Sequence, residues 1–338
     1  MQSYLKLVIV LGLISSCSTL NFWSDDQEED ITKPAELQPF ENEHEISVVW
    51  KKSFKGSNDL GSFKPSFYLG QMFFADSEGN IVSLDSKTGR INWKENLNRN
   101  LSTGIASGYG KLVVSDVNGN VIVIDSESKK TLWKKNIGGE VLSNAVIDTS
   151  LILVKNSVGE LVALEASSGK KEWVFRSQLP ALTVRGTGEP IIENGMVIST
   201  FDNGRLGVFQ LNTGFFLWDG PISFVEGSSE LENLIDADSS PVIVNQLIFA
   251  TNYQGNLTAF DMAQKRPVWN AKASSFYSPV IGRGMIIVIQ EDGSLLSYAS
   301  SNLAPSWSSN EYMRRDLSSG IILNNLLFVG DLEGYIHL

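Results

Sequence analysis

The sequence of 338 residues is poor in the residues on which most enzyme and metal sites depend. It has one cysteine, Cys17, and two histidines, His44 and His337, which stand far apart in the chain. A single cysteine excludes an intramolecular disulfide and a thiolate metal cluster. Two separated histidines supply little for acid–base catalysis. The net charge is −11 and no run of basic residues interrupts it, so nucleic acid is not an expected partner.

Sequence motifs of catalysis are missing as well. The chain contains no Gly-x-Gly-x-x-Gly, no Walker loop, no His-Glu-x-x-His and no Gly-x-Ser-x-Gly. It also lacks a helical hydrophobic period of useful length. We therefore expect a non-catalytic, all-β protein without a cofactor or a bound metal ion.

The first apolar run is too short to cross a membrane. It extends over eight residues, from Leu7 to Ile14, whereas a membrane-spanning helix needs about 20. Its length is typical of a signal peptide, and Ile14-Ser15-Ser16-Cys17 resembles a bacterial lipobox. We expect a signal peptide over residues 1–16 and lipidation of Cys17; a plain secretory signal with a coincidental cysteine is the alternative.

An acidic segment follows the cysteine. Residues 17–45 contain nine acidic side chains and one basic side chain, Lys33. Together with Pro34 and Pro39, this composition is typical of an extended, solvated spacer. The expected organisation is a tether over 17–45 and a folded domain over 46–338.

The folded domain is built from a repeat. Six glycines each stand fourteen residues before a tryptophan, and a seventh, Gly334, comes close to the last residue; the pairs are Gly79 and Trp93, Gly119 and Trp133, Gly159 and Trp173, Gly204 and Trp218, Gly255 and Trp269, and Gly293 and Trp307. Each unit of about 40 residues reads as four short strands separated by turn residues. Such units, repeated, predict a β-propeller of four-stranded antiparallel blades.

The turn before each tryptophan identifies the type of repeat. Asp85-Ser-Lys-Thr-Gly89-Arg-Ile-Asn-Trp93 recurs with variations at Glu165 and Gln210. This motif resembles the tryptophan-docking repeat of pyrroloquinoline-quinone (PQQ) dehydrogenases, and no repeat has the Gly-His partner of a WD40 blade. The repeat spacing is longest in two places, where Ser177–Pro190 and Val225–Ser239 link an outermost strand to the next innermost one. These two enlarged loops are expected side by side on one face of adjacent blades, as a composite binding surface.

Sequence motifs in and after these loops resemble those of the BamB family, the outer-membrane lipoprotein propellers of the β-barrel assembly machinery. They follow in family order: Leu182-Thr-Val184-Arg185-Gly186, Asp202-Asn-Gly-Arg205, Gly227-Ser-Ser-Glu230, Leu234-Ile-Asp236-Ala-Asp238, and Asn252 to Asp261. The resemblance implies a lipid-anchored scaffold on the periplasmic face of the outer membrane of a Gram-negative bacterium. It would bind a POTRA domain of BamA, within the BAM complex, and assist insertion of barrel proteins. Direct contact with unfolded outer-membrane proteins is a further partner that the resemblance leaves open.

Carried over residue by residue, the resemblance nominates five partner-binding residues: Leu182, Val184, Arg185, Asp236 and Asp238. An apolar pair, a guanidinium and two acids form a reasonable contact set. Two alternatives stay open. Arg185 can pair with Asp236 or Asp238 inside the molecule, and Leu182 and Val184 can be core residues of a strand.

The number of blades departs from the family. BamB propellers have eight, whereas seven glycine-anchored units are visible here. Because the unit at Gly330–His337 resembles a penultimate repeat, the expectation is a sequence truncated at its C-terminus. The alternative is a closed seven-bladed ring in which Val48–Trp50 supplies the outer strand of the last blade.

Two other functions compete with the scaffold. A PQQ-dependent dehydrogenase would need a calcium site and a catalytic acid, and no cluster of Asp, Glu and Asn at a suitable spacing is visible. A propeller lipoprotein acting as a sensor or adhesin would keep the fold and change only the partner.

Overall fold

The computed structural model describes residues 33–39, 46–54, 63–179, 188–222 and 239–338, and all regular structure in them is β-sheet. Within these residues, six four-stranded sheets and one three-stranded sheet follow one another along the chain. Neighbouring strands of every sheet are antiparallel and consecutive. We call the sheets the first to seventh blade, in chain order.

The strands run outward within each blade. The first blade has β1 (Ser66–Tyr68), β2 (Gln71–Ala75), β3 (Asn80–Asp85) and β4 (Ile91–Asn96); the second has β5 (Ala106–Gly108), β6 (Lys111–Ser115), β7 (Asn120–Asp125) and β8 (Thr131–Asn136). The third has β9 (Val146–Ile147), β10 (Leu151–Lys155), β11 (Glu160–Glu165) and β12 (Lys171–Arg176); the fourth has β13 (Ile191–Glu193), β14 (Met196–Phe201), β15 (Arg205–Gln210) and β16 (Phe216–Pro221). The fifth has β17 (Val242–Val244), β18 (Leu247–Thr251), β19 (Asn256–Asp261) and β20 (Arg266–Lys272); the sixth has β21 (Val280–Gly282), β22 (Met285–Ile289), β23 (Leu295–Ala299) and β24 (Pro305–Ser309); the seventh has β25 (Ile321–Leu323), β26 (Leu326–Gly330) and β27 (Ile336–His337).

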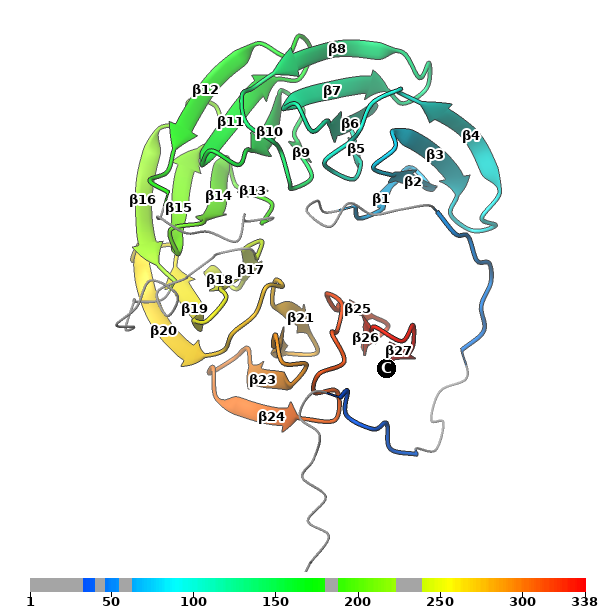
Figure 1. The fold of residues 1–338 in the computed structure, drawn as a ribbon. Helices are drawn as coiled ribbons and strands as arrows, with labels where there is room; N and C mark the ends of the chain where they lie inside the picture. The colour runs from blue at the N-terminus through cyan, green and yellow to red at the C-terminus, as the bar shows by residue number, and fades with distance from the viewer. Residues whose placement is uncertain (1–32, 40–45, 55–62, 180–187, 223–238) are drawn as a thin grey trace, which may run out of the picture.

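The blades are arranged around a common centre, with the innermost strands β1, β5, β9, β13, β17, β21 and β25 facing it (Figure 1). This arrangement confirms the predicted all-β propeller of four-stranded antiparallel blades. The turns between strands follow the predicted repeat: the Asp116 carboxylate, for example, accepts the N–H groups of Asn118 and Asn120, both at 3.0 Å. Such an Asx turn reverses the chain within a few residues.

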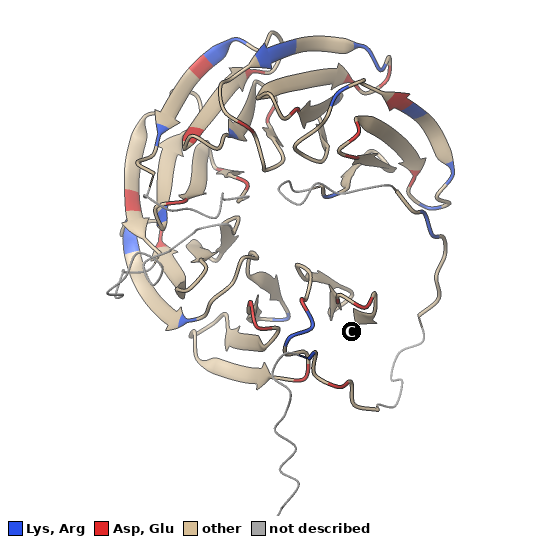
Figure 2. Cartoon of the chain, viewed as in Figure 1, with Lys and Arg blue, Asp and Glu red and all other residues tan. Residues whose placement is uncertain are grey.

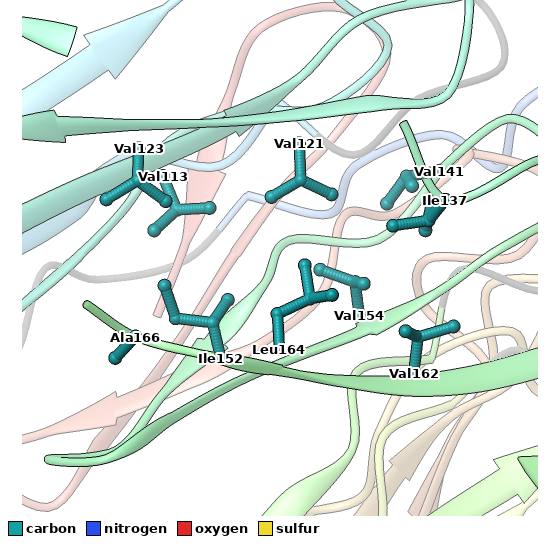
Figure 3. Packing of buried hydrophobic residues seen from close by; sticks show 10 residues of the cluster. All are labelled: Val113, Val121, Val123, Ile137, Val141, Ile152, Val154, Val162, Leu164 and Ala166. Carbon is teal, nitrogen blue, oxygen red and sulfur yellow. The ribbon is translucent and has the colours of Figure 1, made fainter. Parts of the chain in front are cut away.

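The core lies between the blades. The second and third strands of a blade are apolar on both faces because each face contacts a neighbouring blade; β7 and β11 are buried over four consecutive residues. Figure 3 shows the packing of the second blade on the third, which buries ten residues of one cluster: Val113, Val121, Val123, Ile137, Val141, Ile152, Val154, Val162, Leu164 and Ala166. Charged residues are found mainly on the outer strands and the turns, whereas the inner strands carry few (Figure 2).

A tryptophan joins each of several blades to the next. The indole N–H of Trp133 donates to the Ala166 carbonyl at 3.1 Å, and the indole N–H of Trp173 donates to the Leu211 carbonyl at 2.8 Å. Each ring covers the turn glycine of the following blade so closely that a Cβ atom on Gly169 would lie 2.5 Å from the Trp133 ring. The predicted tryptophan-docking repeat is therefore an interaction between blades.

Several turns depart from the glycine pattern; in the fifth and sixth blades the turn residues are Lys265 and Leu303, with positive φ of 55° and 60°. At the second blade the turn residue is Lys129, which takes a positive φ of 62° and places its amine over the Trp93 ring, 5.9 Å from the ring centre. At Gly255 the positive φ belongs to the preceding residue, Gln254, at 52°. The motif thus tolerates other residues where the backbone geometry is kept.

Trp50 makes the same contact with the first blade. Its indole N–H donates to the Ser86 carbonyl at 3.0 Å, and a Cβ atom on Gly89 would lie 2.5 Å from its ring. Phe54 stacks on Phe74 of β2, with ring centres 4.3 Å apart. Residues 46–54 therefore occupy the place that the outer strand of a preceding blade would take.

The other end of the N-terminal segment is attached to the loop between β24 and β25. The Ala35 N–H donates to the Met313 carbonyl at 2.9 Å, and the side chains of Arg314 and Arg315 donate to the carbonyls of Lys33 and Ala35 at 2.6 and 2.8 Å. The two described parts of the segment therefore lie on the outside of the ring, one against the loop between the sixth and seventh blades and the other against the first blade (Figure 1). We call residues 33–39 and 46–54 the strap.

Arg315 is held by a buried ion-pair network. Its guanidinium donates to the fully buried carboxylate of Asp331 at 2.8 Å and also contacts Glu333. His337 contacts the same carboxylate oxygen at 2.9 Å. Burial alone would raise the pKa of Asp331, but the hydrogen bonds with His337 and Arg315 outweigh it and lower that pKa to about 2. The stability that this lowering contributes is present above the ordinary pKa of 3.8 and is lost as the pH falls towards 2.

The alternative of a seven-bladed ring latched by Val48–Trp50 is not observed among the described residues. The seventh blade has three strands, and residues 46–54 form no strand pair with β27. The exposed edge of β27 includes Ile336, which is 69% accessible.

A substitution in the tryptophan contact tests its contribution to stability. Gly169→Ala should lower the free energy of unfolding by about 3 kcal/mol, because it combines strain at positive φ with a clash against Trp133. The control is Gly110→Ala, which has a similar φ of 73° and no heavy atom within 4 Å of the new Cβ, and should cost about 1 kcal/mol. Urea unfolding measures both; equal losses would contradict a specific role for the Trp133 contact.

The buried network at Arg315 predicts an unequal effect of removing two arginines. Arg315→Ala leaves the Asp331 carboxylate buried beside a gap and should cost about 2–3 kcal/mol. Arg176→Ala removes a side chain that is 71% accessible in its pair with Glu160, so its cost should stay below about 1 kcal/mol. Chemical denaturation gives both values. Faster amide exchange at Ala35 in Arg315→Ala alone would report release of the strap.

Candidate functional site: the loop face of the propeller

The two enlarged connections leave the third and fourth blades at the same face of the propeller. One joins β12 to β13 and the other joins β16 to β17, so the blades that carry them are adjacent. The predicted partner-binding residues Leu182, Val184, Arg185, Asp236 and Asp238 lie outside the described residues, as does Cys17. The described roots of these loops show how both are held.

A buried lysine fixes the root of the first loop. Lys155, at the end of β10, donates from Nζ to the Gly188 carbonyl at 3.0 Å and to the Thr200 carbonyl at 2.8 Å. Its amine also lies 5.8 Å from the centre of the Phe201 ring. A buried ammonium needs such partners, and here they come from the loop root and from β14.

Thr200 also fixes the root of the second loop. Its hydroxyl donates to the Ser239 carbonyl at 2.7 Å, and the Ser239 hydroxyl donates to the Thr251 carbonyl of β18 at 2.7 Å. Glu189 joins the two roots directly, because its N–H donates to the Ser240 hydroxyl at 2.8 Å. The two loops therefore leave the scaffold from one continuous hydrogen-bonded base.

The same roots contribute to a ring of residues around the centre. One residue of each blade stands two positions before the innermost strand; in chain order these are Lys64, Gly104, Asn144, Glu189, Ser240, Ser278 and Ser319. We call this set the mouth ring. Lys64 and Glu189 are its charged members, and they belong to the first and fourth blades. The Lys64 amine lies 3.8 Å from Glu189 Oε1, so their side chains meet across the mouth ring.

Glu189 is the most unusual of these residues. Its side chain is 26% accessible, and Oε1 is buried without a hydrogen-bond partner. Burial raises the pKa of Glu189, and the nearby Lys64 lowers it by less. A carboxylate in this position is therefore poorly compensated in the free protein.

Sequence reasoning did not find Lys155 or Glu189. The sequence contained a weak signal for Lys155, because this lysine ends the apolar run Leu151–Lys155. If that end of the strand is buried, its charged side chain must have a partner. Glu189 lies in the enlarged connection Ser177–Pro190, but nothing in the sequence distinguished it there, because its importance depends on Lys64 and Ser240, which are far from it in the sequence.

The described residues supply little for metal chemistry. They contain no group of three or more His, Cys, Asp or Glu that could hold a metal ion. Nor do they include a helix long and apolar enough to cross a membrane.

Known proteins match the chain along most of its length. The family model described as "Outer membrane protein assembly factor BamB" matches residues 77–309. The protein of that name from Pseudomonas aeruginosa is 43% identical over 307 residues, which cover 90% of this chain and 81% of the relative. The one from Kangiella koreensis is 36% identical over 338 residues and covers 99% of this chain and 85% of the relative.

Solved structures agree in fold. The crystal structure of BamB from Moraxella catarrhalis matches with a TM-score of 0.76 at 21% identity, covering 83% of this chain and 88% of that one. A quinohemoprotein alcohol dehydrogenase from Pseudomonas putida matches with a TM-score of 0.61 at 12% identity, covering 84% and 65%. These two likenesses bear on the fold, which enzymes and assembly factors share. The family model and the sequence relatives, which both extend across the blades carrying the enlarged loops, show that the chain belongs to the BamB family of outer membrane protein assembly factors.

Proposed function

We propose that this protein is a lipid-anchored, non-catalytic scaffold subunit of the outer-membrane β-barrel assembly machinery. Its loop face would bind a periplasmic POTRA domain of BamA and so assist the folding and insertion of barrel proteins. The observation that supports this most is the common base of the two enlarged loops. There the Glu189 N–H donates to Ser240, and Lys155 bridges the Gly188 carbonyl of the first root and the carbonyl of Thr200, whose hydroxyl donates to Ser239 of the second root. A base held in this way fixes the roots of the two loops next to each other on the scaffold, which is how loops are commonly positioned for binding.

The nominated contact residues complete the proposal. Leu182 and Val184 would supply an apolar anchor, Arg185 a guanidinium for a carboxylate of the partner, and Asp236 and Asp238 acceptors for its basic groups. The alternative of an internal pair between Arg185 and an aspartate predicts that reversing the charge at Arg185 changes stability. Partner contact predicts that it changes affinity.

Calorimetric titration of a soluble form beginning at Ser18 with the POTRA region of BamA from the same organism tests the function. We expect binding by the wild type and a loss of affinity of at least about a hundredfold in Arg185→Glu, because reversal at a desolvated pair costs several kcal/mol. Lys94→Glu is the matched control, since Lys94 is an exposed residue of the first blade and the same charge change there should leave affinity unaltered.

Two results would count against parts of this proposal. Binding that survives Arg185→Glu would keep the function and move the interface away from these loops. Absence of binding by the folded wild type would leave a propeller lipoprotein with another role, such as a sensor or an adhesin.

Lipidation of Cys17 is tested separately. Cells that make the wild type with labelled palmitate should incorporate the label and retain the protein in the outer-membrane fraction. Cys17→Ser should incorporate none and move to the soluble periplasmic fraction, because the acyl chains are the proposed anchor. A wild type without label would favour the plain secretory signal.

A further inference from the structure

The mouth ring has an acceptor that no donor satisfies. Among the described residues, four buried side-chain atoms have no hydrogen-bond partner; one is Glu189 Oε1, and two others, Ser143 Oγ and Asn144 Oδ1, belong to the neighbouring third blade. Asn144 occupies in the third blade the position that Glu189 occupies in the fourth. Three of the four unsatisfied polar atoms therefore belong to the entries of two adjacent blades, the third and the fourth.

The partner that Glu189 has is weakly held. The Lys64 amine stands at 3.8 Å, beyond hydrogen-bond distance, and the Lys64 side chain is 57% accessible. An exposed lysine in such a pair contributes little to stability, because water screens the pair and the long side chain loses rotamer freedom. Removing Lys64 from this place therefore costs the protein little.

We propose that Glu189 receives a lysine or arginine side chain of the protein partner that binds the loop face, and that Lys64 stands in its place in the free protein. This inference rests on the proposed function and adds a contact at the centre of the surface, between the two enlarged loops. The incoming cation would donate to the unsatisfied carboxylate while the partner excludes water, which makes the pair stronger than the one with Lys64.

The donor set favours a protein side chain over a metal ion. A calcium site needs six to eight oxygen ligands, usually with several carboxylates, and Glu189 is the acidic member of the mouth ring. An ammonium or guanidinium needs only one carboxylate and a few neutral acceptors. The approach of the Lys64 amine shows that a group of this kind fits beside Glu189.

The physical cost of Glu189 to the fold supports a role in binding. Its pKa is raised in the folded protein, so the folded state holds this proton more tightly than the unfolded state does. The tighter binding of this proton stabilises the folded protein at pH values below the ordinary pKa of 4.5. This stabilisation is lost as the pH rises through the raised pKa of Glu189. At neutral pH the charged form is therefore a burden, and Glu189→Gln should unfold at an equal or higher urea concentration than the wild type.

Two neutralising substitutions on opposite sides of one ion pair test the proposal. The POTRA region of BamA is titrated into the wild type, Glu189→Gln and Lys64→Gln under the same conditions. Glu189→Gln should weaken binding at least tenfold, whereas Lys64→Gln should leave the affinity unchanged or increase it, because it removes the competing cation. Glu189→Ala provides a second variant with the same expected loss, should the glutamine find new partners.

Each other outcome is decisive in a different way. Equal weakening in Glu189→Gln and Lys64→Gln would mean that the pair acts as an internal brace that positions the loops, and the proposal would fall. Unchanged affinity in both Glu189 variants would mean that the carboxylate is merely solvated, which also overturns it. Absence of binding by the wild type would contradict the proposed function itself. The two outcomes described above overturn only the role of Glu189, because the wild type still binds in both.

Discussion

The contact of a tryptophan with the turn of the next blade is the interaction on which the rest of the structure depends. An isolated four-stranded blade has two apolar faces and cannot bury either alone, so the register between blades must be fixed from outside the sheet. The indole does this by combining a large apolar area with one directional N–H donor. Trp50, Trp133 and Trp173 make this contact with equivalent carbonyls in the turns of the first, third and fourth blades, and the closeness of the ring to Gly89 and Gly169 leaves no room for another spacing.

That constraint explains which parts of the fold could be predicted from the sequence. The distance of fourteen residues from glycine to tryptophan is a local property, and it predicted the blades, their strand order and the enlarged connections. What it could not predict is where non-local partners meet. Lys129 takes a turn position that is glycine in the first, third and fourth blades, and Trp50 has no glycine ahead of it, yet it docks on the first blade.

The candidate site shows the same limit more strongly. The five nominated contact residues came from a resemblance in loop motifs, and the positions of their side chains stay predictions. The base beneath them was invisible in the sequence, because Lys155, Thr200, Ser239 and Glu189 come from three different blades and acquire their roles only when the propeller assembles. A hydrogen bond such as the one from the Glu189 N–H to Ser240 joins residues 51 apart, which no local pattern records.

The strap has a mechanical consequence. A chain pulled at its N-terminal end transmits tension first to residues 33–35, where the contacts with Met313, Arg314 and Arg315 oppose it. Only after these contacts give way does the tension reach Trp50 and the first blade. If the protein hangs from an acylated Cys17, it therefore hangs from the loop between its sixth and seventh blades, and any drag on the propeller strains three hydrogen bonds before it strains a β-sheet.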